Sequence, residues 1–180
     1  TGDGAAPDLE SARRIHAALV AEGYAPSLVR LGAIHEELGQ PDEAISAYER
    51  AIEETDSDYA RLRLAQAHAT GALGDGSRPE WGFEQLQELS RTADTLLADY
   101  ALARAYEEGS GTPVDLDAAL ALYETLADRG YPLAQGRLGA LYAAGRGVPQ
   151  DGVRAVAYYR AAAEGGYDWA LIGLARTEVA

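Results

Sequence analysis

The stretch LGALYAAGRGVPQDGVRAVAYYRAAAEGG, residues 138–166, repeats residues 102–130 at a shift of 36 positions. The shift superimposes tyrosines on tyrosines and glycines on glycines. The matched pairs are Tyr106 with Tyr142, Tyr123 with Tyr159, Gly109 with Gly145 and Gly111 with Gly147. So many matches at one offset indicate an internal structural repeat.

A leucine marks each copy and extends the pattern beyond these two segments. Successive motif leucines lie 33, 38, 36 and 36 residues apart, and they are Leu31, Leu64, Leu102, Leu138 and Leu174. The residues four positions after them are His35, His68, Tyr106, Tyr142 and Glu178. A spacing of four places side chains on one face of an α-helix. We therefore expect one helix, called the A helix, around each motif leucine.

A second helix type, the B helix, alternates with the A helix. Its face reads Ala-x-x-x-Tyr-x-x-x-Ala at residues 119–127 and again at 155–163. No segment alternates with the two-residue period of a strand, so the expected fold is all-α with ten helices. The A helices are expected at 25–38, 58–70, 96–108, 132–144 and 167–180, and the B helices at 8–22, 41–55, 79–93, 115–129 and 151–164.

These helices group into one repeat solenoid, residues 8–180, after a disordered start at residues 1–7. A leading B helix (8–23) comes first, and a final A helix (167–180) comes last. The four repeats between them are 24–57, 58–94, 95–130 and 131–166. Neither end carries a polar capping repeat, so we expect either a segment of a longer repeat protein or an end that docks on a partner.

The glycine-rich stretch AAGRGVPQD, residues 143–151, has two readings, a phosphate cradle or a turn. A dinucleotide fingerprint needs a strand before its glycines, whereas here a helix precedes them. We therefore expect a turn, with positive φ at Gly145 and Gly147. Pro149 then suits the opening of the next helix, and Asp151 its positive end.

Residues 138–166 resemble the Sel-like repeat, a relative of the tetratricopeptide repeat, through Leu-Gly-x-x-Tyr, Gly-x-Gly-Val, Ala-x-x-x-Tyr and Ala-Ala-x-x-Gly. Residues 102–130 match this pattern well, and residues 25–56 are closer to a plain tetratricopeptide repeat. The repeat from Leu64 is degenerate, because Leu86 stands where an aromatic residue is expected. The resemblance implies a right-handed α-solenoid of antiparallel helix pairs that binds other proteins.

Composition narrows the class of partner. The 180 residues carry 29 acids against 15 bases, a formal charge of -14, and an acidic surface repels nucleic acid. The absence of cysteine excludes disulfides and thiol catalysis. No apolar run is long enough to span a membrane. We expect a protein partner and no transmembrane segment.

No arrangement of polar residues suggests an enzyme, and we expect no catalytic residue, metal ligand or cofactor. The histidines His16, His35 and His68 fall at packing positions of the repeat, and no second ligand or nucleophile accompanies them. Acid pairs such as Glu36-Glu37 and Glu107-Glu108 end A helices, and we expect them to be solvated.

The arginines give the most specific functional prediction. In the families that this chain resembles, A helices line a concave groove that holds the partner. One arginine per A helix is expected to face it, with three aromatic residues nearby: Arg30, Arg63, Arg104, Arg137, Arg176, Tyr59, Tyr100 and Trp169. Guanidinium groups suit bidentate contacts with carboxylates, so an acidic partner is favoured. The alternative is that each arginine pairs with an acid on a neighbouring helix.

The irregular turn LGDGSRPEWGFEQL is also similar to turns of the Sel-like scaffold lipoproteins of bacterial alginate export. That weaker resemblance implies a periplasmic or secreted scaffold in exopolysaccharide secretion. A lipid-bearing cysteine is absent from this sequence, so only a fragment of such a protein fits. Two alternatives stay open: an adaptor that senses a peptide or small ligand, and an enzyme regulator in the cytoplasm.

Overall fold

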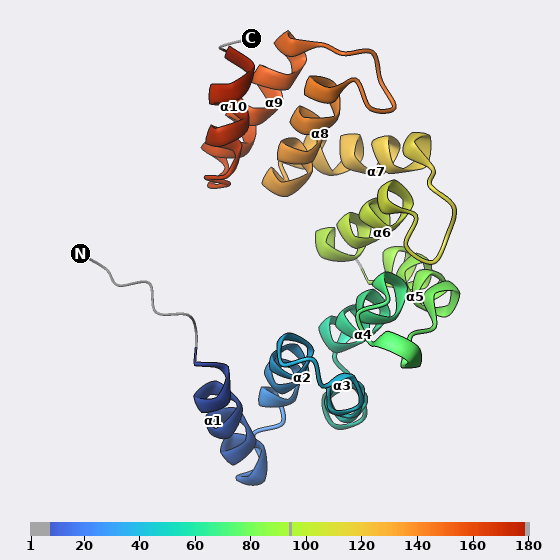
Figure 1. Cartoon of the computed structure of the whole chain (residues 1–180), viewed down its shortest axis with the longest axis vertical. Helices are drawn as coiled ribbons and strands as arrows, with labels where there is room; N and C mark the ends of the chain where they lie inside the picture. Colours follow the sequence, from blue (N-terminus) through green and yellow to red (C-terminus); the bar gives the residue numbers. More distant parts are fainter. Residues whose placement is uncertain (1–7, 94, 179–180) are drawn as a thin grey trace, which may run out of the picture. The chain divides into compact units, whose positions relative to one another are not determined.

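The computed structural model describes residues 8–93 and 95–178, and in these ranges it contains ten α-helices, one 3-10 helix and no strand (Figure 1). This confirms the predicted all-α fold of helix pairs. The expected disordered start, residues 1–7, lies outside the described residues. The elements are α1 (Leu9–Ala21), α2 (Ser27–Glu37), α3 (Pro41–Thr55), α4 (Asp58–Thr70), η1 (Gly74–Gly76), α5 (Pro79–Thr92), α6 (Leu96–Glu108), α7 (Leu116–Asp128), α8 (Pro132–Ala144), α9 (Gly152–Glu164) and α10 (Ala170–Glu178).

The chain divides into two compact units, one ending at Leu89 and the other beginning at Ser90. In the first unit, α1 packs on α2, α2 on α3 and α3 on α4. In the second, each helix from α6 to α10 packs on the next, and the A helices α8 and α10 also touch. These helices thus pack mainly against their neighbours along the chain, as in repeat proteins.

Helix starts are fixed by side-chain caps. Asp8, Asp115 and Asp151 each accept a hydrogen bond from the backbone N–H three residues later, as do Ser57 and Thr95. These caps satisfy N–H groups that have no partner inside the helix, and each contributes about 1 kcal/mol.

The small residue after the motif leucine lets an A helix approach a tyrosine of the B helix. A Cβ added to Gly139 on α8 would lie 2.8 Å from the ring of Tyr159 on α9, and Gly32 on α2 faces the ring of Tyr48 on α3 in the same way. In the degenerate repeat the small residue is Gly82 on α5 itself, which lies against the backbone of α4. This reversal explains why Leu86 can replace the aromatic residue there.

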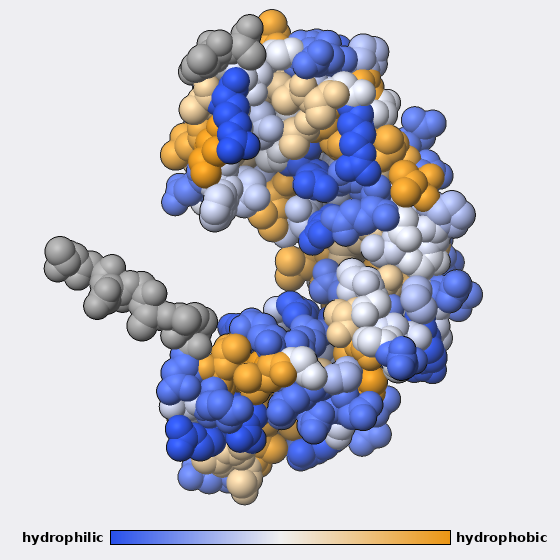
Figure 2. All heavy atoms as spheres, viewed as in Figure 1, coloured by the Kyte–Doolittle hydropathy of each residue, from blue (hydrophilic) through white to orange (hydrophobic). Residues whose placement is uncertain are grey.

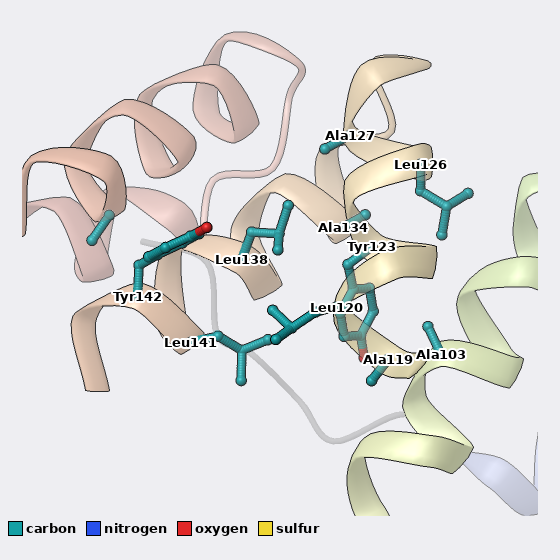
Figure 3. Packing of buried hydrophobic residues seen from close by; sticks show 11 residues of the cluster. Ala103, Ala119, Leu120, Tyr123, Leu126, Ala127, Ala134, Leu138, Leu141 and Tyr142 are labelled. Carbon is teal, nitrogen blue, oxygen red and sulfur yellow. The ribbon is translucent and has the colours of Figure 1, made fainter. Parts of the chain in front are cut away.

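The core of the second unit gathers the repeat residues of α6 to α9 (Figure 3). Tyr123 and Leu138 are fully buried at its centre, and Tyr142 is buried beside them, stacked with Tyr158. Tyr106 and Tyr159 pack against the edge of this cluster. Of the motif leucines, Leu31, Leu64, Leu102 and Leu138 are buried, whereas Leu174 on the final helix is only half-buried.

The glycine-rich stretch forms a turn, and its geometry repeats. Gly145 and Gly147 have φ angles of 66° and 74°, and the upstream copies Gly109 and Gly111 have 74° and 72°. In each copy the capping aspartate donates its N–H to the carbonyl of the tyrosine that precedes the turn: Asp115 to Tyr106, and Asp151 to Tyr142. These contacts account for the conserved layout of the two turns without any ligand.

Local details differ from the prediction, and α2, for example, begins at Ser27 rather than at 25. The final helix begins at Ala170 rather than 167, because Tyr167 to Trp169 form a turn closed by the bond from the Ala170 N–H to the Tyr167 carbonyl. Pro149 lies before the N-cap Asp151, outside the helix that it was expected to open.

Candidate functional site

A pocket of about 340 Å³ lies in the second unit, between α6, α8, α9, α10 and the turn before α10. Four aromatic and two basic side chains dominate its lining: Tyr100, Tyr159, Tyr167, Trp169, Arg137 and Arg176. Gly136 and Gly173 leave room for the rings of Tyr167 and Tyr159, respectively. The pocket therefore combines flat apolar surface with positive charge.

This pocket brings together four of the eight predicted groove residues: Tyr100, Arg137, Trp169 and Arg176. Arg104 lies on α6 in the same unit but pairs with Glu108 one turn later. The other three, Arg30, Arg63 and Tyr59, belong to the first unit. Tyr159 and Tyr167 also line the pocket, and they were not among the predicted groove residues because both occupy regular repeat positions.

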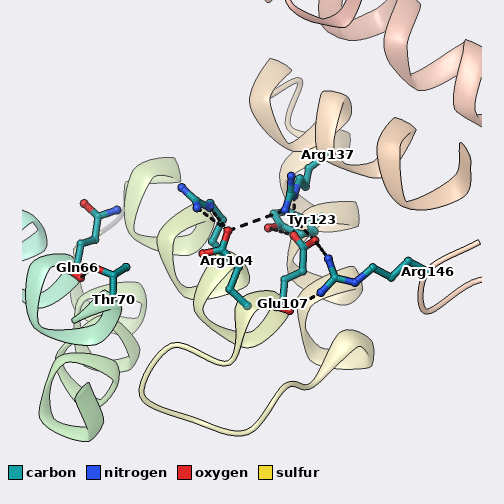
Figure 4. A network of polar contacts seen from close by, with 8 residues as sticks. Gln66, Thr70, Arg104, Glu107, Tyr123, Arg137 and Arg146 are labelled. Carbon is teal, nitrogen blue, oxygen red and sulfur yellow. Dashed lines mark hydrogen bonds and ion pairs between the residues drawn. The ribbon is translucent and has the colours of Figure 1, made fainter. Parts of the chain in front are cut away.

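Arg137 is held at the pocket by a buried carboxylate. Glu107 on α6 is only 1% exposed, and it accepts hydrogen bonds from Nε and Nη2 of Arg137 at 2.7 and 2.9 Å (Figure 4). The hydroxyl of Tyr123 and Nη1 of Arg146 also donate to it, at 2.9 and 2.8 Å. The expectation that Glu107 is solvated is therefore wrong: three donors from α7, α8 and the following turn surround it.

The charges of this cluster shift the pKa values of its members. Burial and the negative charge of Glu107 raise the pKa of Tyr123, which stays protonated and donates to the carboxylate. Burial lowers the pKa of Arg137, but the hydrogen bonds and charge of Glu107 more than offset this effect, so the pKa is raised. Both shifts favour the ion pair with a neutral tyrosine beside it.

A related cluster occurs in the first unit. Arg63 on α4 donates to Glu36 on α2 at 2.6 Å, and the buried Tyr48 lies beside the pair. Glu36 and Glu107 both stand five residues after a motif leucine, and Arg63 and Arg137 both stand one residue before the next. We call these positions, with the B-helix tyrosine between them, the Glu–Tyr–Arg set. The recurrence of this set in the sequence indicates a paired glutamate, and the expectation that the acid pairs are solvated did not take it into account.

In the sequence, the other two pairs of successive A helices lack the Glu–Tyr–Arg set. In the degenerate repeat the three positions hold Ala69, Leu86 and Ala101, each of them buried. At the last junction between A helices they hold Ala143, Tyr159 and Gly173, so only the tyrosine is kept. The arginine thus appears where the preceding repeat supplies the glutamate.

For the predicted groove arginines, the alternative prediction was pairing with an acid on a neighbouring helix. Arg63 and Arg137 form such pairs. The prediction does not describe Arg30 or Arg176, which are exposed and form no ion pair with another described residue. Tyr59 is 46% exposed on α4. Among the basic groups that line the pocket, Arg176 thus lacks an acidic partner in the described part of the chain.

The rings of the pocket differ in their contacts and exposure. Tyr100 packs edge-on against Tyr131, with ring centroids 5.5 Å apart, and against Tyr123 at 5.8 Å. Trp169 is 72% exposed on the turn before α10. Burial raises the pKa of Tyr159, and the positive charges of Arg137 and Arg176 act in the opposite direction.

Beside the pocket, α10 exposes an apolar face. Leu171, Ile172, Ala175 and the stem of Arg176 line a shallow hollow. Figure 2 shows apolar surface over this helix next to strongly polar side chains. Within residues 8–93 and 95–178, no helix combines the length and apolarity needed to cross a membrane. The same residues hold no cluster of histidine, aspartate and glutamate suited to a metal ion.

Comparison with family models decides what these helix pairs are. Residues 96–131 and 132–167 each match the Sel1 repeat, and residues 25–67 match a tetratricopeptide repeat. Residues 96–167 are two Sel1 repeats. The pocket is therefore built from helices α6, α8 and α9 of the Sel1 repeats together with α10, which follows them.

Solved structures with Sel1 repeats have the same fold. A Sel1 repeat protein from Oxalobacter formigenes superposes with a TM-score of 0.65 at 21% identity, over 94% of this chain and 74% of that chain. The protective antigen c5321 of uropathogenic Escherichia coli, which displays an SLR fold, gives 0.59 at 23% identity, over 92% of this chain and 35% of that chain. At these identities the likeness concerns the fold alone.

A curated relative in sequence is chitin synthase regulatory factor 4 of Schizosaccharomyces pombe. It is 31% identical over 150 residues, which cover 74% of this chain and 24% of the relative. The chain thus spans about a quarter of the length of that protein. Sel1 and tetratricopeptide repeats serve as scaffolds for protein–protein interaction, which is the general role that the matched families assign to this chain.

Proposed function

We propose that this protein is a non-catalytic scaffold that binds a segment of a partner protein in the pocket between α6, α8, α9 and α10. The observation that carries the proposal is the joint presence of four aromatic rings and two guanidinium groups around one pocket of about 340 Å³. Tyrosine, tryptophan and arginine are the residues that dominate binding energy at protein interfaces.

The aromatic rings of the pocket support a short peptide segment as the bound element. Tyr100 is fixed by two ring contacts, so it loses little freedom when a ligand packs on it. Trp169 is largely exposed and offers a broad apolar face that a partner would cover. A bound side chain would thus lie between one fixed ring and one accessible ring.

Selection of peptides from a random displayed library against the full chain tests this proposal. The affinity of a selected peptide is then measured for Trp169→Ala, Arg176→Gln and the control Arg154→Gln, which removes a charge from α9 outside the pocket lining. We expect the two pocket variants to bind about tenfold more weakly and the control to bind like the parent. Equal affinities for all the variants would place the binding site elsewhere.

The biological setting remains a prediction from the sequence. A periplasmic or secreted location and a role in exopolysaccharide secretion, such as that of alginate, rest on the resemblance of the irregular turn alone. The name of the fungal relative describes a regulator of an enzyme, which favours a regulatory adaptor as the second candidate function. Measuring whether binding changes the activity of an identified partner enzyme distinguishes the adaptor from a passive scaffold.

A further inference from the structure

The last junction keeps the tyrosine of the Glu–Tyr–Arg set but neither of its charged partners. In the junction before it, the Tyr123 hydroxyl donates to Glu107, which Arg137 also binds. One repeat later Ala143 replaces the glutamate and Gly173 replaces the arginine. The Tyr159 hydroxyl consequently has no hydrogen-bond partner among the described residues, and its ring lines the pocket.

Gly173 fixes the place of the Tyr159 ring. A Cβ at this position would lie 2.5 Å from the ring, and one at Gly139 would lie 2.8 Å from it, so the ring packs between the backbones of α8 and α10. An arginine at residue 173 would not fit there. Arg176, one helical turn later, lines the same pocket instead.

The hydrogen-bond donors around the Tyr159 side of the pocket belong to cationic or neutral side chains. Arg137 uses Nε and Nη2 for Glu107, which leaves Nη1 for another acceptor. Arg176 has no acidic partner among the described residues, and both guanidinium charges act on Tyr159. The pocket thus offers N–H and O–H donors without a carboxylate of its own on the Tyr159 side.

We infer that the pocket binds a carboxylate of the partner protein, which contacts Tyr159 and Arg176 as Glu107 contacts Tyr123 and Arg137. The inference rests on the proposed function and specifies the chemistry of the bound segment. The rings of Tyr167 and Trp169 lie beside the carboxylate position, so the segment has an apolar or aromatic residue next to its acid.

The distribution of charge favours binding of a carboxylate at this pocket over binding elsewhere on the acidic surface. The chain carries a net charge of -14, so acidic segments are repelled by most of its surface. Arg137 and Arg176 both line the pocket, however, and of the two only Arg137 is paired with an acid of the described chain. A carboxylate is therefore attracted to this pocket rather than to the surface at large.

Three short peptides provide a direct test, because two of them carry one carboxylate each and the other is neutral. The probe is acetyl-Gly-Phe-Glu-Gly-amide, its neutral match has Gln for Glu, and acetyl-Gly-Phe-Gly with a free C-terminus offers the carboxylate at the chain end. Binding to the full chain is followed by the fluorescence of Trp169 in a Trp81→Phe background, since these are the two tryptophans. We expect the Glu probe to bind about tenfold more tightly than the Gln probe, as a charge-assisted contact requires.

Two conservative variants identify the contacts. Tyr159→Phe removes only the hydroxyl, and Arg176→Gln removes the charge while keeping a long polar side chain; each should lower the affinity of the Glu probe to that of the Gln probe. Arg154→Gln should leave both affinities unchanged. The relative affinity of the free C-terminal probe then shows whether the site prefers a side-chain or a terminal carboxylate.

Equal affinities of the Glu and Gln probes, or no saturable signal from the Glu probe up to about 10 mM, would overturn the inference. Retention of the Glu preference in Tyr159→Phe and Arg176→Gln would overturn it as well. The proposed function fails on a different result, namely library peptides whose affinity does not depend on Trp169 or Arg176. Neutral peptides that bind through Trp169 would uphold the scaffold proposal and overturn the carboxylate inference.

Discussion

Glu107 on α6 and Arg137 on α8, which are 30 residues apart in sequence, form a two-point hydrogen-bonded ion pair between two A helices, at 2.7 and 2.9 Å. The carboxylate is buried, while the guanidinium is about one-third exposed. The pair therefore ties one repeat to the next and fixes the orientation of a pocket arginine.

Removal of the charge of Glu107 should destabilise the second unit. Glu107→Gln leaves Arg137 and Arg146 without their anion, and because both arginines reach solvent we expect a loss of about 2–3 kcal/mol rather than more. Urea unfolding measures this loss. Glu108→Gln, which breaks a surface pair with Arg104, is the control and should cost about 0.5 kcal/mol. Similar losses of unfolding free energy for the two variants would show that the buried ion pair contributes no more to stability than the surface pair.

The two buried tyrosines of the Glu–Tyr–Arg sets should respond differently to loss of the hydroxyl. Tyr123→Phe removes the donor to Glu107 and should cost about 1–2 kcal/mol. The Tyr48 hydroxyl is buried with no hydrogen-bond partner, so Tyr48→Phe should be neutral or stabilising. Thermal unfolding of both variants checks this order, which a larger loss in Tyr48→Phe would contradict.

The turn at Gly147 should tolerate no side chain. Its φ is 74°, and an added Cβ would lie 2.9 Å from Cβ of Leu116. Gly147→Ala should therefore cost more than about 2 kcal/mol of unfolding free energy. About 1 kcal/mol comes from the positive φ, and the rest comes from the steric clash with Leu116. Gly130→Ala is a matched control with a φ of 75° and open space around its Cβ. Equal losses in the free energy of unfolding would remove the steric part of the explanation.

His68 should make the first unit less stable in mild acid. Its Nδ1 accepts a hydrogen bond from the backbone N–H of Arg78 at 3.2 Å, and its ring packs edge-on against Trp81. Burial lowers the pKa of His68 below its ordinary 6.5, and the charge of Arg78 lowers it further. Because the unfolded chain binds the proton at higher pH, stability is complete above pH 6.5 and decreases as the pH falls toward the folded pKa.

Urea titrations between pH 7.5 and 5.5, about one unit either side of the unfolded value, measure this dependence. His68→Asn keeps an acceptor close to the position of Nδ1 without a titrating ring. The variant should be less stable at neutral pH but should show a flatter dependence on pH in this range. A slope unchanged from that of the parent protein would assign the effect to other groups.

The repeat spacing predicted the helices because packing positions recur in every copy. Caps such as Asp115 and Asp151 followed from local rules, since a cap depends on residues three apart. The starts of α2 and α10 were predicted too early because a turn precedes each of them, closed by the bond from the Ser27 N–H to the Tyr24 carbonyl and by the bond from the Ala170 N–H to the Tyr167 carbonyl. Local signals thus gave the elements, and they failed at the boundaries of these two helices.

The pocket was predicted only in part, for a physical reason. Arg137, Arg176, Tyr100 and Trp169 were identified from their offsets on A helices, and the structure gathers them. The burial of Glu107 was not predicted, because the position five residues after a motif leucine lies off the packed face of its own helix. Its partners come from three other segments, and only the folded chain brings them together.

The placement of Glu107 and Arg137 on successive repeats limits how the molecule can be rearranged. A chimera in which the repeat that contains Glu107 is followed by one that begins like α10, with glycine in place of Arg137, strands an anion inside the protein. The reverse order leaves an arginine without its anchor. When these repeats are shuffled or duplicated in engineered proteins, the repeat that supplies the glutamate must therefore be followed directly by the repeat that supplies the arginine.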